Sequence, residues 1–471
     1  MNKMHLMLAA SALAITGLAV AASLAGRPSA TEDEAIRVVP GKPAATPIPA
    51  SFSGTGPYLP LAAAAATVAG VIEERMPRNA DASNQAAWWI PLAIHGGSHY
   101  FAFDSPGATV ATHEVKVGRR DAAGVWTFGS LLKADGTVWS QTDDPGHYQP
   151  TIAIDSDGYI HVWADMHNND WRYFRSSAPG DISDLRQRTD MPGHGQFTYP
   201  VAKTAPNGDV WLFLRNRSGS DGTGELYRWT NAANSWAKIS GFAYTAGAVV
   251  YPDDMAFGSD GTISLAWEWA KTMPRALRHY GSYLRYNPAT NAWSYMDGTA
   301  ATIPVTLTSS PKLFFLPLQP GETFTTDETL QGVQSVKLAL DSNNRPTIAY
   351  RYRPTDGSGL KNFDVWRIRW NGSAWVDKEK IYTANNDVPA GLGLTRTATR
   401  VRIYFATDSG GLQRAARTAT TPWVTTALAP GRDIERVNVT PIDDANDLIY
   451  GGAPTDIDAN TGSVYWLKST D

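Results

Sequence analysis

From about residue 85 onward, one pattern recurs: an apolar run, a tight turn, and a second run in which apolar and polar residues alternate. Short turns of the Asn/Asp/Gly type between such runs are typical of β-hairpins. The clearest copies read IAIDSDGYIHVWA, VAKTAPNGDVWLFL, DMAFGSDGTISLAWEW and LALDSNNRPTIAYRY. The pattern predicts turns at Gly158, Gly208, Gly261 and Asn344.

A second kind of hairpin is marked by tryptophan. Copies such as YRWTNAANSWAKI, LRYNPATNAWSYM and IRWNGSAWVDK carry an aromatic residue before a polar turn and a tryptophan after it. The marker tryptophans are Trp126, Trp236, Trp293, Trp375 and Trp423. Most spacings in the chain are close to 50–57 residues or about twice that, as in a repeat protein. The 82 residues between Trp293 and Trp375 (375 − 293) predict an insertion, TLTSSPKLFFLPLQPGETFTTDETL.

The two hairpins together predict the architecture. Two hairpins in each period give a four-stranded unit, and radial repetition of such units is a β-propeller. About 385 residues at a period of ~55 residues give about seven units. We therefore predict an all-β chain: a seven-bladed β-propeller of four-stranded antiparallel blades over residues 85–471. A long β-sandwich would not explain the period.

The N-terminal region reads differently. Residues 1–25 carry Lys3, an apolar run and a plausible cleavage site, which predicts a signal peptide; an uncleaved membrane anchor is the alternative. Residues 26–84 are rich in Pro, Ala and Thr and predict an extended linker or strap, with a possible short helix in LAAAAATVAGVIEERMP. We expect a secreted or periplasmic protein, without a membrane segment after processing and monomeric. With 0 Cys, it must be stabilised by a large core rather than by disulfides.

Composition limits the partners. Net charge is −4 and charged residues make up only 18% of the chain, so no basic field favours nucleic acid. The 17 Trp suit both β-structure and sugar binding, since aromatic faces pack on pyranose rings. A polyanionic substrate would need a local basic cluster.

Hairpin register predicts a site. If DSDG is a tight turn, His147 and His167 lie opposite each other at the open end of one hairpin. In the next unit, Tyr199 and Arg215 face each other at the same level. In the third, Tyr251 lies opposite Trp267–Trp269. Since hairpins of successive units point the same way, we expect His147, His167, Tyr199 and Arg215 to line one cleft near the axis, with the Arg215 guanidinium exposed to it.

These residue types suit β-elimination from a uronic acid. Arg215 would neutralise the carboxylate and stabilise the enolate-like transition state. A neutral histidine is a good base near neutral pH, and Tyr199 is the favoured acid, although the sequence leaves open which of His147, His167 and Tyr199 takes each role. Paired carboxylates, a Cys nucleophile and a G-x-S-x-G elbow are not evident, which weakens hydrolytic alternatives.

Two segments carry a family resemblance. GHYQPTIAIDSDGYIHVWADMHNNDWRYFRSSAPGDISDL and TYPVAKTAPNGDVWLFLRNRSGSDGTGELYRW resemble the BNR-4-type propeller of ulvan lyases and rhamnose–glucuronate lyases. The resemblance is strongest over residues 145–285 and implies catalytic roles for His147, His167, Tyr199 and Arg215. The segment LRHYGSYLRY resembles a later family segment whose histidine lies near the site, which adds His279. We expect Tyr251, Trp267 and His279 to bind an anionic polysaccharide.

No cofactor is required for this chemistry, and the metal content is left open. TDIDANTGS places Asp456, Asp458 and Asn460 at alternate positions, as calcium loops do, although ordinary turns use the same residues. His147 with His279 could instead hold a structural metal. The alternatives to a lyase are a sialidase-like propeller hydrolase and a non-catalytic lectin-type propeller that stacks sugars on Tyr251, Trp267 and Trp269.

Overall fold

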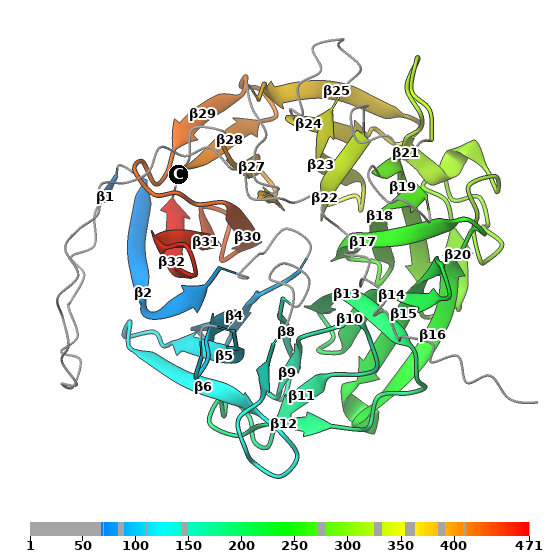
Figure 1. Cartoon of the computed structure of the whole chain (residues 1–471). Helices are drawn as coiled ribbons and strands as arrows, with labels where there is room; N and C mark the ends of the chain where they lie inside the picture. Colours follow the sequence, from blue (N-terminus) through cyan, green and yellow to red (C-terminus); the bar gives the residue numbers. More distant parts are fainter. Residues whose placement is uncertain are drawn as a thin grey trace, which may run out of the picture.

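The computed structural model describes residues 67–68, 70–82, 89–109, 111–142, 149–271, 278–324, 332–353, 363–384, 391–407 and 411–470. These segments are almost entirely β-strands, arranged in a ring around a central axis (Figure 1). In the described part, regular helix is limited to the 3-10 turns η2 (Asn231–Ala233) and η3 (Pro311–Leu313). No helix in these segments is long and apolar enough to cross a membrane. The predicted signal peptide lies outside the described residues.

The chain is organised in successive runs of antiparallel strands. The first two runs are β3 (Leu92–His95), β4 (Ser98–Pro106), β5 (His113–Arg120) and β6 (Trp126–Leu132), then β8 (Thr151–Ile154), β9 (Ile160–Trp163), β11 (Tyr173–Ser176) and β12 (Leu185–Arg188). The next two are β13 (Gln196–Thr204), β14 (Val210–Ser218), β15 (Asp221–Thr230) and β16 (Ser235–Ala243), then β17 (Ala248–Phe257), β18 (Ile263–Lys271), β19 (Arg278–Asn287) and β20 (Ala292–Ser294).

Later runs follow the same order. They are β22 (Gly332–Leu340), β23 (Pro346–Arg353), β24 (Asp364–Trp370) and β25 (Trp375–Tyr382), then β26 (Leu392–Arg396), β27 (Arg400–Ala406), β28 (Leu412–Thr418) and β29 (Val424–Ala427). The chain ends with β30 (Arg436–Pro441), β31 (Asn446–Asp458) and β32 (Thr461–Thr470). Four short strands pair with these longer ones or with β2 (Val71–Asp81): β1 (Thr67–Val68) with β2, β7 (Ser140–Gln141) with β5, β10 (His167–Asn169) with β13 and β21 (Phe314–Leu316) with β19.

The N-terminal segment closes the ring. Strand β2 (Val71–Asp81) pairs antiparallel with β32 and so adds an outer strand to the last run. Figure 1 shows the two lying side by side although they come from opposite ends of the sequence. The expectation of a strap with a short helix is therefore wrong for residues 71–81, where the backbone groups are paired in a sheet. Closure of this kind protects an exposed strand edge.

The predicted turns are confirmed. Gly158, Gly208, Gly261 and Asn344 all have the left-handed backbone that such turns need, with φ of 88°, 88°, 78° and 59°. The outer hairpins carry the predicted aromatic pairs, as in Trp229 with Trp236, Tyr286 with Trp293 and Trp370 with Trp375. The predicted insertion falls between β20 and β22 and contains η3 and β21.

The core lies between neighbouring runs, because both faces of the middle strands are covered. Strand β14 is buried at six consecutive positions, and one apolar cluster joins Trp163 of the second run to Leu212 and Trp229 of the third. The first strand of each run faces the axis, where a cavity of about 460 Å³ is lined from β3, β8, β13, β17, β22, β26 and β30. The site described next lies where β13 and β17 begin.

Candidate functional site

Three side chains from three adjacent strands lie in one row. Thr198 of β13 is paired with His167 of β10 on one side and with Arg215 of β14 on the other. Paired residues in a sheet project from the same face with Cβ atoms roughly 4.5–5.5 Å apart. The pairing therefore brings His167 and Arg215 to the same level of the molecule, on either side of Thr198.

His167 reaches this row by a route that hairpin register did not predict. Strand β9 ends at Trp163, two residues before Asp165, whose φ of 55° turns the chain. The following strand, β10, leaves the β8–β9 hairpin and joins β13 of the next run. The expectation that the hairpin continues to His167 is therefore wrong, because hairpin register assumes uninterrupted strands. His147 lies outside the described residues.

Tyr199 adopts an unusual backbone conformation. Its φ is 56°, and the β13–β14 register shifts between Thr198 and Val201, which marks a bulge. This conformation interrupts the alternation of side chains along β13. The Tyr199 ring packs against those of Trp89 and Tyr251, with centroid distances of 5.2 and 5.4 Å. A left-handed backbone conformation is energetically unfavourable for a residue other than glycine, and residues that adopt it cluster at functional sites.

Arg215 contacts Tyr199, although its register partner is Thr198 and not Tyr199 as predicted. Its guanidinium carbon lies 4.8 Å from the centre of the Tyr199 ring and 4.9 Å from that of Tyr251. The guanidinium is not exposed to a cleft, however: Arg215 is only 1% exposed. The prediction of exposure is wrong because aromatic residues of two neighbouring strands enclose the side chain. Such contacts also hold the cation by its attraction to the ring faces.

Arg278 was missed by the sequence analysis. It is buried in β19, and its guanidinium carbon lies 4.1 Å from the centre of the Tyr251 ring. The guanidinium groups of Arg215 and Arg278 therefore both lie against the ring of Tyr251. The register between β18 and β19 could have identified Arg278. That register pairs Arg278 with Ala270, and so places Arg278 near Glu268, two residues earlier in β18.

A buried carboxyl pair lies beside Arg278. Glu268 of β18 lies opposite Tyr251 of β17 in the strand register. Its Oε2 is 3.9 Å from Nε of Arg278. Burial and the charge of the neighbouring Asp253 raise the pKa of Glu268 well above its usual range. Burial also raises the pKa of Asp253 to about 7. Paired carboxylates do occur at this level, contrary to the sequence analysis, but both are fully enclosed.

Trp267 and Trp269 are core residues. Each is 0% exposed, and both belong to an apolar cluster in which Trp267 packs against Phe242 at 5.4 Å. Rings enclosed in this way cannot serve as stacking surfaces for a sugar. The expected binding role of Trp267 is therefore not supported by its position. Tyr251 does lie at the predicted level opposite residues 267–269.

His279 is positioned by the insertion. It is buried in β19 opposite Trp269, and its Nδ1 lies 2.8 Å from a carboxylate oxygen of Glu322. The other Glu322 oxygen accepts a hydrogen bond from the backbone of Gln319. The insertion that the spacing predicted therefore supplies the partner of a candidate site residue. A metal shared by His147 and His279 stays a prediction.

In the candidate calcium loop, the carboxylate oxygens of Asp456 and Asp458 accept hydrogen bonds from nearby residues. Asp458 accepts a hydrogen bond from the backbone of Asn460 in the turn between β31 and β32, and Asp456 accepts one from the Tyr465 hydroxyl. This is ordinary turn chemistry. Calcium binding here stays a prediction.

Comparison with known proteins gives a family match and distant relatives. A model of BNR repeat-containing family members (BNR_4) matches residues 86–381. A curated relative, the ulvan lyase PL25 of Pseudoalteromonas sp. (strain PLSV), is 23% identical over 273 residues. That match covers 50% of this chain and 52% of the relative, so the chain spans about half the length of the curated relative it matches.

Solved structures extend the likeness in fold. The PL25 ulvan lyase bound to -[GlcA(1-4)Rha3S]- has a TM-score of 0.63 at 16% identity, covering 82% of this chain and 93% of that one. The polysaccharide lyase Uly1 has a TM-score of 0.60 at 14% identity, covering 81% and 90%. At these identities the likeness shows a shared, propeller-like fold.

Proposed function

Because the chain belongs to the BNR repeat-containing family, we propose that it is a polysaccharide lyase that cleaves a uronic-acid-containing polymer by β-elimination. The observation that carries the proposal is the convergence of Arg215 and Tyr199, with His167 on the strand beside them. The distant PL25 relative is an ulvan lyase, which supports the same reaction class.

Each residue has a defined task in this proposal. Arg215 pairs with the uronate carboxylate and stabilises the charge that develops when the C5 proton leaves. A histidine, His167 or His147, removes that proton, and the Tyr199 hydroxyl protonates the O4 leaving group. The C4–O4 bond breaks as the C4–C5 double bond forms. Since Arg215 is enclosed, productive binding requires a rearrangement that opens a path to its guanidinium.

The proposed substrate is rich in rhamnose and glucuronate or iduronate, as in ulvan. The support is that one related structure holds -[GlcA(1-4)Rha3S]-. We further propose seven four-stranded blades, closed by β2 on β32, for a protein that acts outside the cytoplasm as a monomer after removal of residues 1–25.

Two alternatives are less well supported. Glycosidase carboxyl groups stand ~5–9.5 Å apart with substrate between them, whereas the side chains of Asp253 and Glu268 are both fully enclosed. A lectin that stacks sugars on Trp267 or Trp269 would need accessible rings, and neither ring is exposed.

The test is to incubate the purified protein with ulvan and with other uronate polysaccharides. A lyase generates the ultraviolet absorbance of the unsaturated uronate. A hydrolase generates reducing ends without that absorbance, and a lectin only binds. Release of reducing ends with no rise in absorbance on any uronate polymer would contradict the proposal.

A further inference from the structure

A second cluster of chemically active side chains lies between the first two runs. Asp104 comes from β4, His113 begins β5, and Asp165 follows β9. His113 Nε2 lies 2.8 Å from an oxygen of Asp165 and 4.0 Å from an oxygen of Asp104. One ligand atom from each of the three lies within 4.8 Å of the other two, and all three residues are buried.

The charges of the cluster favour a cation. Burying a carboxylate is strongly unfavourable unless positive charge compensates it. A divalent cation bound among the three side chains would compensate both carboxylates and leave the imidazole neutral. The second oxygen of Asp165 accepts a hydrogen bond from Trp139, and Arg172 donates to its main-chain carbonyl. Outer contacts of this kind fix the direction of a ligating carboxylate.

We propose that Asp104, His113 and Asp165 form a binding site for a divalent transition metal, with Zn²⁺ as the preferred ion. One imidazole nitrogen and two carboxylate oxygens suit zinc, whereas calcium prefers oxygen ligands alone. Zinc bonds of about 2.0–2.2 Å place neighbouring tetrahedral ligand atoms roughly 3.4 Å apart. The observed separations of 2.8 and 4.0 Å lie on either side of that value, so small side-chain shifts would bring each carboxylate oxygen to a zinc-ligand distance from the imidazole nitrogen.

The metal would link two neighbouring runs and hold the turn that leads to His167. Asp165 lies two residues before His167 and has the left-handed backbone that redirects the chain toward β10. The role is structural. It depends on the geometry of the three ligands and not on the proposed lyase activity.

The experiment measures metal content and stability in the full chain. The protein is stripped with a chelator, returned to metal-free buffer, and titrated separately with Zn²⁺, Mn²⁺ and Ca²⁺ by calorimetry and thermal unfolding. We expect about one equivalent of Zn²⁺ per chain and an unfolding midpoint that rises with zinc concentration. D104N and H113Q should each abolish stoichiometric binding. X-ray absorption of the zinc-loaded wild type should show a first shell of nitrogen and oxygen that includes an imidazole, and this measurement needs no variant to fold.

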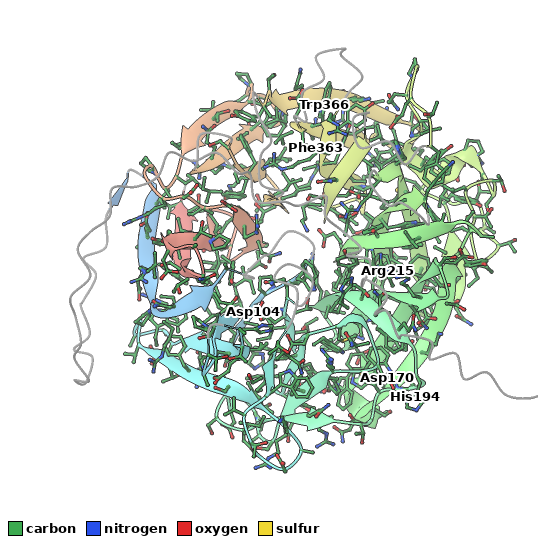
Figure 2. All side chains as sticks on the ribbon, in the orientation of Figure 1. Asp104, Asp170, His194, Arg215, Phe363 and Trp366 are labelled. Atoms are coloured by element: carbon green, nitrogen blue, oxygen red, sulfur yellow. The ribbon has the colours of Figure 1, made fainter. Side chains whose placement is uncertain are left out.

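The matched control is H194Q. His194 pairs with Asp170 at 2.7 Å, but both are exposed, and Figure 2 shows them together toward the edge of the ring, away from Asp104. H194Q should keep zinc binding. The proposal is overturned if none of the three ions binds stoichiometrically, or if folded D104N and H113Q still bind one equivalent of zinc.

Discussion

The guanidinium carbon of Arg215 lies 4.8 Å from the centre of the Tyr199 ring. The two residues come from adjacent strands, and Figure 2 places Arg215 on the inner side of the ring. The residues proposed to neutralise the carboxylate and to protonate the leaving group are therefore in contact, through the guanidinium of one and the ring of the other. Residues in contact rarely contribute independently, so we expect the effects of changing both to be non-additive.

Arg215→Lys should lose activity by about 10²–10³-fold, and Arg215→Ala by at least as much. Lysine keeps the charge but cannot replace the planar fork that pairs with a carboxylate. The measurement is the rate of unsaturated uronate formation from a uronate polymer. Arg228→Lys is the control, because Arg228 pairs with Asp209 away from Tyr199 and Tyr251 and should keep wild-type turnover.

Tyr199→Phe should lower kcat by about 10²–10⁴-fold, the usual contribution of a proton-transfer group. Phenylalanine keeps the ring that packs on Trp89 and Arg215 and removes only the hydroxyl, and the unfolding midpoint of the variant shows whether it is folded. Tyr244→Phe removes an exposed hydroxyl bonded to Asp221 and should leave kcat unchanged. Near wild-type turnover in both Tyr199→Phe and Arg215→Ala would rule out the elimination site described here.

Asp253→Asn should flatten the dependence of stability on pH. The pKa of Asp253 is raised from 3.8 to about 7 in the folded protein, so the folded state binds this proton more tightly than the unfolded state. Its contribution to stability is complete below about pH 4 and is lost as pH rises toward about pH 7. Unfolding free energy from denaturant titrations across this range should fall less steeply in the variant. Asp135→Asn, at an exposed turn, should keep the wild-type slope; an identical slope in Asp253→Asn would show that Asp253 does not titrate as stated.

Acid should weaken the junction where the ring closes. His99 accepts a hydrogen bond from Trp466 of β32 at Nδ1, and burial, followed by Arg120 and Lys468, lowers its pKa from 6.5 to about 4. The folded state therefore disfavours the protonated ring, and stability should fall as pH drops below about 6.5 toward about 4. His99→Asn keeps an acceptor without a titrating group.

Thermal unfolding between about pH 7 and about pH 5 should show a smaller acid-induced drop in His99→Asn than in the wild type. His194→Asn, at an exposed histidine, should behave like the wild type. If all three proteins lose the same stability on acidification, His99 is not responsible.

The sequence by itself determined what depends on local periodicity. Turns at Gly158 and Gly208 and the aromatic pairs of the outer hairpins follow from alternation and turn chemistry, which act over a few residues. The contact between Tyr199 and Arg215 was predicted from the same register, although the structure reaches it through a bulge that leaves Arg215 paired with Thr198.

Only the tertiary structure decided how neighbouring runs meet. In the folded chain, His167 lies on a strand that pairs with the next run, and residues 71–81 pair with β32. Asp253 lies beside Glu268, and Trp267 is fully buried. Hairpin register stops where a strand bends or bulges, and it carries no information on which side chains of two separate sheets pack together. Those contacts depend on the shape and burial of residues far apart in the chain, so the burial and charge of the candidate site became visible only in the folded ring.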